Sequence, residues 1–163
     1  MISTDDLEEF APTVWTVVFI PKEVEDWFDH LSPKWARHVM AFGYIVDANA
    51  WIVVDPVQKV HRIFYVPDET FMGWLEMLRL RPVRAVRIRQ QAGSTYNARL
   101  GNWCTQTIAR LVGVRSSALR PIALYRDLLK AGAYPVFEES NVDQDQSPQN
   151  RGRSSNQETS RAG

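Results

Sequence analysis

The chain has 163 residues, of which 45% are hydrophobic and 23% charged, a balance that excludes a chain disordered throughout. Its net charge is zero, but residues 1–78 hold 13 acids and 5 bases, whereas residues 79–130 hold 11 bases and one acid. No apolar run approaches the roughly 20 residues of a membrane helix, and a single cysteine excludes an intrachain disulfide.

The first predicted elements are a strand and a short helix. Trp15–Ile20 is β-branched and aromatic and stops at Pro21, which indicates a strand. Glu23–Leu31 carries apolar side chains at helical spacing, which predicts a helix that Pro33 ends. Residues 1–9 are acidic where a secretory signal is basic and then apolar, so we expect synthesis in the cytoplasm.

Three further apolar runs predict an antiparallel meander. Arg37–Val46 and Trp51–Asp55 flank a short polar turn, as the two strands of a β-hairpin do. Arg62–Val66 follows as a third strand, because it is β-branched and aromatic and ends at a proline.

A helix and a strand are predicted next, followed by a loop. Asp68 or Thr70 is the expected N-cap of a helix that continues to Arg79. Val83–Arg89 has the composition of a strand. Residues 90–102 contain glycine, serine and asparagine, which indicates a loop.

Two helices complete the predicted domain. The first begins around Cys104, with Asn102 as its expected N-cap and Gly113 at the position where helices favour glycine. The second begins at Pro121, a residue suited to the first helical position, and Gly132 closes it.

The C-terminal region differs from the rest in composition. Residues 138–163 contain no large apolar residue after Val142, so they cannot bury enough surface to offset their ordering entropy. We therefore expect a disordered polar tail over residues 138–163 and a single α+β domain over residues 1–137.

Cys104 is the first candidate for chemistry. The start of a helix favours a thiolate through the helix dipole, and its free N–H groups can stabilise an oxyanion. A free cysteine is also a small buried hydrophobe, and Cys104 shares an apolar stripe with Ile108, so a purely structural role stays open.

A cysteine nucleophile needs a base, normally a histidine that a third polar group orients. His30 and His61 lie among charged residues and are expected at the surface. His38 opens a long apolar strand, where a polar side chain needs a partner or a cavity, although a structural histidine remains the alternative. Asp55 ends the strand that pairs back on the His38 strand and can orient it; a simple Asp-Pro turn is the alternative for Asp55.

The order of these residues along the chain resembles a known family. A strand that opens with His38, a partner strand that ends in Asp55 and a later helix that opens with Cys104 look like the circularly permuted branch of the papain-like NlpC/P60 superfamily. Residues 119–128 are also similar to small phage and prophage proteins of this type, and the likeness covers about residues 36–130.

The resemblance implies an antiparallel sheet packed against the cysteine-bearing helix, and a thiol attack on an amide or ester carbonyl. It implies Cys104 as nucleophile, His38 as base and Asp55 as the orienting residue, without a metal or an organic cofactor. Substrates of the family are peptidoglycan peptides, other amides or acyl groups. Asn102, Trp103 and Tyr96 are the candidate pocket residues.

Two other interpretations stay open. The stretch Arg79–Arg89 suggests a polyanion-binding module, but it matches no nucleic-acid-binding motif and reads more simply as a solvated strand face, so we do not expect a nucleic-acid partner. The uneven charge and the tail also suit a non-catalytic structural or adaptor protein of a phage or prophage. A phage protein would act in the virion or after release on lysis.

Overall fold

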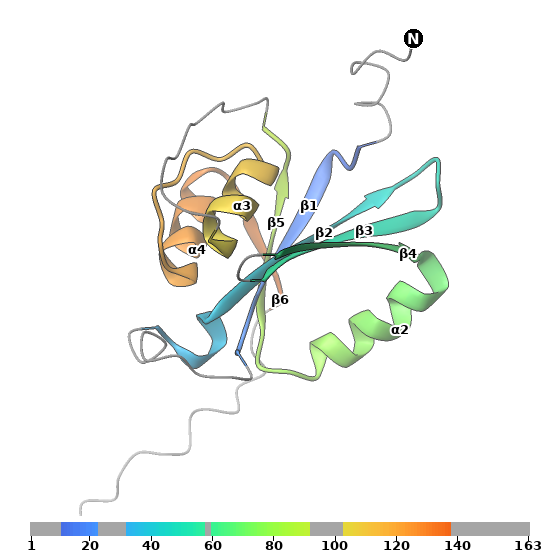
Figure 1. The fold of residues 1–163 in the computed structure, drawn as a ribbon, viewed down its shortest axis with the longest axis horizontal. Helices are drawn as coiled ribbons and strands as arrows, with labels where there is room; N and C mark the ends of the chain where they lie inside the picture. Colours follow the sequence, from blue (N-terminus) through green and yellow to red (C-terminus); the bar gives the residue numbers. More distant parts are fainter. Residues whose placement is uncertain (1–10, 23–31, 58–59, 92–102, 138–163) are drawn as a thin grey trace, which may run out of the picture.

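The computed structural model describes residues 11–22, 32–57, 60–91 and 103–137, which form a mixed α+β fold (Figure 1). Its centre is a six-stranded antiparallel sheet in the order β4-β3-β2-β1-β5-β6. The strands are β1 Val14–Ile20, β2 His38–Ile45, β3 Ala50–Val57, β4 Val60–Pro67, β5 Arg84–Arg89 and β6 Tyr134–Phe137; the helices are the short 3-10 turn η2 Lys34–Ala36, then α2 Asp68–Arg79, α3 Cys104–Leu111 and α4 Pro121–Lys130.

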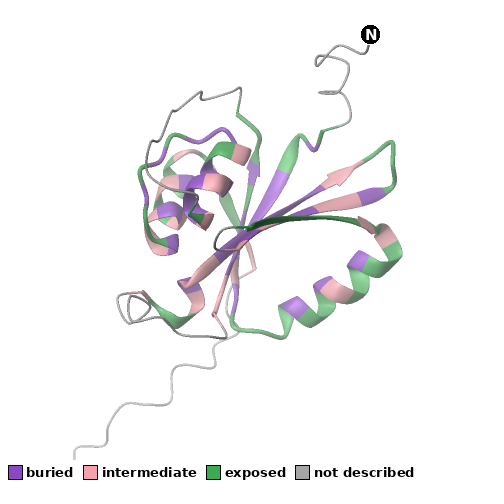
Figure 2. Cartoon of the chain, in the orientation of Figure 1, coloured by how far each residue is buried: buried purple, intermediate pink, exposed green. Residues whose placement is uncertain are grey.

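The sheet has a separate hydrophobic core on each face, because its central strands carry apolar side chains at successive positions. In Figure 1, α2 covers one face while α3 and α4 cover the other, and Figure 2 shows the buried residues concentrated between these layers. Burial on both faces explains why the strands read as continuous apolar runs. The α2 core includes Val18, Phe42, Val53, Phe71 and Leu75, and the α3/α4 core includes Val17, Val39, Val54, Ile108 and Leu124.

The structure confirms most of the predicted elements and adds two. The five predicted strands and the helices ending near residues 79, 112 and 131 are present, with bounds that shift by a few residues. The turn η2 and the strand β6 were not predicted. β6 has four residues and contains Pro135, and a proline removes a ladder donor, so only an edge position suits it; β6 is indeed an edge strand.

The predicted N-caps were wrong where the structure describes them. Pro67, not Asp68 or Thr70, occupies the N-cap position of α2. Asp68 is the first helical residue, and its Oδ1 accepts a hydrogen bond from Trp51 Nε1 at 2.7 Å. The carboxylate therefore connects the helix to the sheet instead of capping the helix.

The predicted C-terminal glycines are confirmed. Gly113 follows α3 with φ +75°, and Gly132 follows α4 with φ +94°. A Cβ on Gly113 would collide with the carbonyl oxygen of Gln91. Gln91 N–H also donates to Val112 O at 3.1 Å, so glycine lets the end of α3 approach the chain that leaves β5.

Several expectations fall on residues outside the described ranges. These are the helix Glu23–Leu31, most of the loop 90–102, and the tail 138–163. None of the helices in the described part of the chain is long and apolar enough to cross a membrane.

Candidate active site

His38 and Asp55 come from neighbouring antiparallel strands. Pairing between β2 and β3 runs from Ile45–Ala50 to Ala41–Val54, and continuing this register places Asp55 diagonally across from His38. His38 Nε2 and Asp55 Oδ1 lie 2.6 Å apart. Their side chains are only 19% and 21% exposed, so the bond is partly shielded from water.

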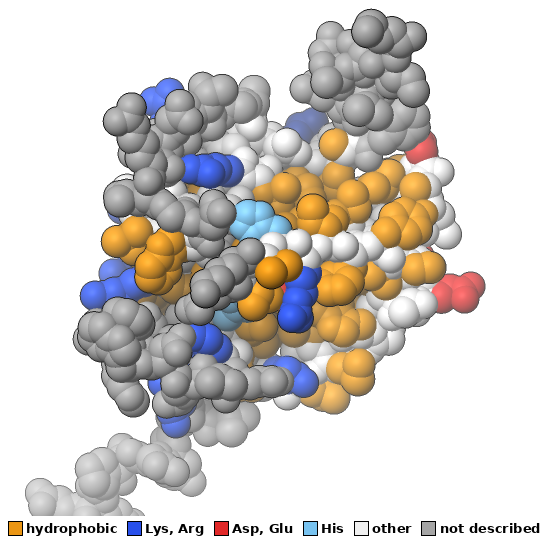
Figure 3. All heavy atoms as spheres, in the orientation of Figure 1, with side chains coloured by type: hydrophobic (Ala, Val, Ile, Leu, Met, Phe, Trp, Pro, Cys, Tyr) orange, Lys and Arg blue, Asp and Glu red, His pale blue; other side chains and the backbone are white. Residues whose placement is uncertain are grey.

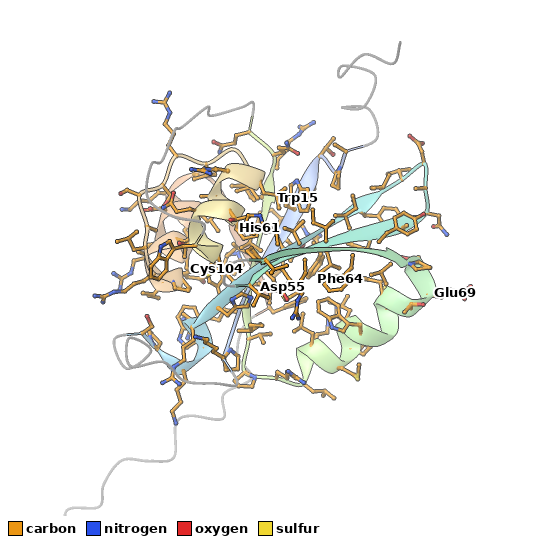
Figure 4. The ribbon with its side chains drawn as sticks, viewed as in Figure 1. Trp15, Asp55, His61, Phe64, Glu69 and Cys104 are labelled. Carbon is orange, nitrogen blue, oxygen red and sulfur yellow. The ribbon has the colours of Figure 1, made fainter. Side chains whose placement is uncertain are left out.

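Cys104 reaches these two residues from a helix that lies much later in the chain. It is the first residue of α3, which packs on β2 and β3, and its side chain lies close enough to His38 to raise the pKa of the imidazole. Figure 4 shows Cys104 and Asp55 near the junction of α3 and the sheet, and the thiol is partly exposed.

The surroundings of His38 favour its protonated form. Burial acts to lower its pKa, but the hydrogen bonds to Asp55 and Cys104, together with their negative charge, outweigh burial and raise the pKa from 6.5 to about 9. At neutral pH the imidazole is therefore an imidazolium. A positive charge beside a cysteine favours the thiolate form of that cysteine.

We expect the free energy of unfolding to decrease as the pH rises from about 6.5 to about 9. The pKa of His38 is higher in the folded protein than its ordinary value, so folding favours protonation. The stabilisation is complete below pH 6.5 and is lost as the pH passes through about 9, with an upper bound on the order of 3 kcal/mol. Urea unfolding at a series of pH values measures this change.

His38→Gln is the control for this pH dependence, because glutamine keeps a hydrogen-bonding group but does not titrate. The difference between wild type and His38→Gln should shrink across the same pH range. A constant difference between the two proteins from pH 6 to pH 9.5 would contradict a raised pKa of His38.

His61 lies close to this site, which the sequence interpretation missed. It is exposed, as expected, but its Nε2 is 3.3 Å from Thr107 Oγ1, one helical turn beyond Cys104. The strand register explains this position, because β4 pairs His61 with Pro56 and Arg62 with Asp55. The charged neighbours of His61 in the sequence indicate only that it lies at the surface. Its position next to α3 follows from the pairing of β4 with β3.

Of the three candidate pocket residues, the structure describes only Trp103. Its side chain is 51% exposed beside Cys104 and occupies the N-cap position of α3 without making a side-chain capping bond. The expected N-cap, Asn102, is therefore wrong, because Trp103 holds that position; Asn102 and Tyr96 themselves lie outside the described residues. The first turn of α3 thus receives no cap from the Trp103 side chain, and its N–H groups are suited to bind an oxygen anion.

Polar contacts also hold α3 in place, which the predicted apolar stripe did not include. Gln106 is buried, and its Nε2 donates to Ala118 O at 2.9 Å. Ser116 Oγ in the same connection donates to Asp127 Oδ2 of α4 at 2.7 Å. These bonds fix the helix that carries Cys104 to the segment leading into α4.

The arginines of Arg79–Arg89 do not form one stripe. The Arg84 guanidinium lies over the Trp35 ring, 4.2 Å from its centroid. Arg87 and Arg89 are exposed, and the alternation of side chains along β5 puts them on the opposite face from Arg84. The basic stretch is therefore divided between two faces of the sheet.

Neither a metal site nor a known relative helps to interpret this geometry. No three His, Cys, Asp or Glu side chains in the described ranges are grouped so as to hold a metal ion. Comparisons with protein-family models, curated proteins and solved structures found no match to this chain. The arrangement of Cys104, His38 and Asp55 therefore has to be interpreted from its own chemistry.

Proposed function

We propose that this protein is a cysteine hydrolase of the peptidase or amidase type, built on a permuted papain-like scaffold. The observation that carries the proposal is the convergence of Cys104, His38 and Asp55, which α3, β2 and β3 contribute separately: His38 is hydrogen-bonded to Asp55, and Cys104 lies close enough to raise the pKa of His38. A nucleophile, a base and an orienting group in contact are the components that thiol catalysis needs. The order of elements agrees with the permuted arrangement, in which the histidine strand precedes the cysteine helix.

Attack begins with His38 protonated. With a pKa of about 9, His38 already carries a proton at neutral pH and stands beside Cys104 as an imidazolium, and the thiolate is the reactive form of a cysteine nucleophile. The thiolate attacks the substrate carbonyl carbon and forms a C–S bond, and the carbonyl oxygen becomes an oxyanion. The backbone N–H groups at the start of α3 donate to this oxygen.

Collapse of the tetrahedral intermediate breaks the bond to the leaving group. His38 donates its proton to the departing amine or alkoxide, which leaves a thioester on Cys104. A water molecule then attacks the thioester while neutral His38 takes its proton, which releases the acid and regenerates protonated His38. Asp55 keeps the imidazole oriented through its 2.6 Å bond to Nε2 in both half-reactions.

The substrate class is an amide, ester or acyl group, and cell-wall peptides are the natural first candidates. The thiol is partly exposed, and Trp103, with 51% of its surface accessible, stands next to it. An exposed indole beside the nucleophile offers a flat apolar surface against which a substrate side chain or acyl group can pack.

Acyl-enzyme trapping tests the proposal without knowledge of the natural substrate. We expect p-nitrophenyl acetate to release a burst of nitrophenol equimolar with the enzyme, because the thiolate acylates faster than the thioester is hydrolysed. Mass spectrometry after acid quenching should find the acetyl group on the peptide that contains Cys104. Acetylation confined to lysine side chains, without a burst, would refute the proposed nucleophile.

A further inference from the structure

The strand β4 is an edge of the sheet with an unusually apolar surface. No strand in the described part of the chain pairs with its outer side. Its exposed residues include Val60 at 58%, Ile63 at 68%, Phe64 at 46% and Tyr65 at 63%. Figure 3 shows hydrophobic side chains gathered over the strands at the front of the molecule.

Both faces of β4 carry this apolar character. The register places Ile63 opposite Val54 of the α3/α4 core and Phe64 opposite Val53 of the α2 core, so their side chains extend the two faces of the sheet. Edge strands of monomeric proteins are normally interrupted by charges or proline. The other edge strand, β6, contains Pro135, whereas the segment Ile63–Tyr65 of β4 contains neither a charged residue nor a proline.

Charged residues of opposite sign flank the apolar centre of β4. Arg62 stands near its beginning, and Asp68 and Glu69 follow directly after its end, at the start of α2. Figure 4 shows His61, Phe64 and Glu69 in succession along this edge. An antiparallel copy of the same strand reverses this order, so it brings an acidic end next to each basic end.

We infer that β4 pairs antiparallel with β4 of a second copy of this chain, which joins the two sheets into one. A two-fold contact needs a surface that is complementary to itself, and an apolar strand with a basic start and an acidic end meets this condition. Pairing about Phe64 places Ile63 opposite Tyr65 of the second copy and Arg62 opposite its Val66, two positions before its Asp68. The contact satisfies the free backbone groups of both edges and covers apolar side chains on both faces.

The mass of the full-length protein in solution tests this inference. Sedimentation and light scattering from about 1 to about 200 µM should show a transition to twice 18.7 kDa. Ile63→Lys places a charge in the strand centre and should raise the dissociation constant at least about tenfold. Leu80→Lys is the matched control, because Leu80 is 88% exposed at the far end of α2 and should not change dimerisation.

A pair of opposite charges placed across the two-fold axis identifies the contact itself. Adding Tyr65→Glu to Ile63→Lys should restore the dimer, because the axis pairs residue 63 of each copy with residue 65 of the other. A wild-type chain that stays monomeric over the whole range, or equal weakening by Ile63→Lys and Leu80→Lys, would overturn the inference. So would a double variant Ile63→Lys/Tyr65→Glu that dimerises as weakly as Ile63→Lys alone.

Discussion

Iodoacetamide is expected to alkylate Cys104 rapidly even at pH 5.5, and His38→Ala should slow this reaction by roughly 10²- to 10³-fold. An ordinary thiol with a pKa of about 8.5 is ionised only to about one part in 10³ at that pH. The protonated His38, with its pKa of about 9, keeps its charge beside Cys104 throughout the acidic range. The rate of Cys104 modification between about pH 4 and pH 9, followed by mass spectrometry, measures this effect.

The control for alkylation separates charge from accessibility. His61→Ala removes the exposed histidine that contacts Thr107, one turn away, but leaves His38 and Cys104 in place, so it should change the pH profile little. At pH 9.5, where an ordinary thiol is itself ionised, wild type and His38→Ala should react at similar rates. If wild type reacts slowly at pH 5.5 and the His38→Ala variant matches it, Cys104 is core packing.

Cys104→Ala should abolish turnover of p-nitrophenyl esters by the enzyme, a loss of at least about 10³-fold in kcat/KM. The substitution removes the nucleophile, and no other cysteine exists in the chain to replace it. Because the side chain is only partly buried and small, the midpoint of thermal unfolding should change by only a few degrees. Full activity in Cys104→Ala would contradict the proposed mechanism directly.

Asp55→Asn should have a smaller effect on turnover, about 10- to 10³-fold in kcat, because asparagine can still accept a bond from His38 Nε2 but supplies no charge. Asp47→Asn is the matched control: the same substitution in the exposed β2–β3 turn, away from His38, should leave kcat unchanged. The apparent pKa of the alkaline limb of kcat/KM, near 9 in wild type, should fall in Asp55→Asn, because a charge that favours the imidazolium is removed.

Local patterns were sufficient to predict much of this fold. The β-branched runs at Trp15–Ile20 and Trp51–Asp55, and the helical stripe before Arg79, reflect side-chain period and backbone propensity, which act over a few residues. Gly113 and Gly132 were predictable because a positive φ favours glycine whatever surrounds it. The N-cap of α2 was not, since Asp68 bonds to Trp51 of β3, which is remote in sequence.

The candidate site, like the fold, was predictable from the sequence only in part. The sequence by itself determined that a lone cysteine opens a helix and that His38 opens a strand, and the hairpin placed Asp55 within reach of it. Only the tertiary structure decided that α3 packs over this end of β2 and β3, that His61 contacts Thr107, and that β4 is an exposed edge. These relations join residues up to 66 positions apart, as for His38 and Cys104. They depend on which layers pack together to bury the two cores, and no short-range periodicity encodes that choice.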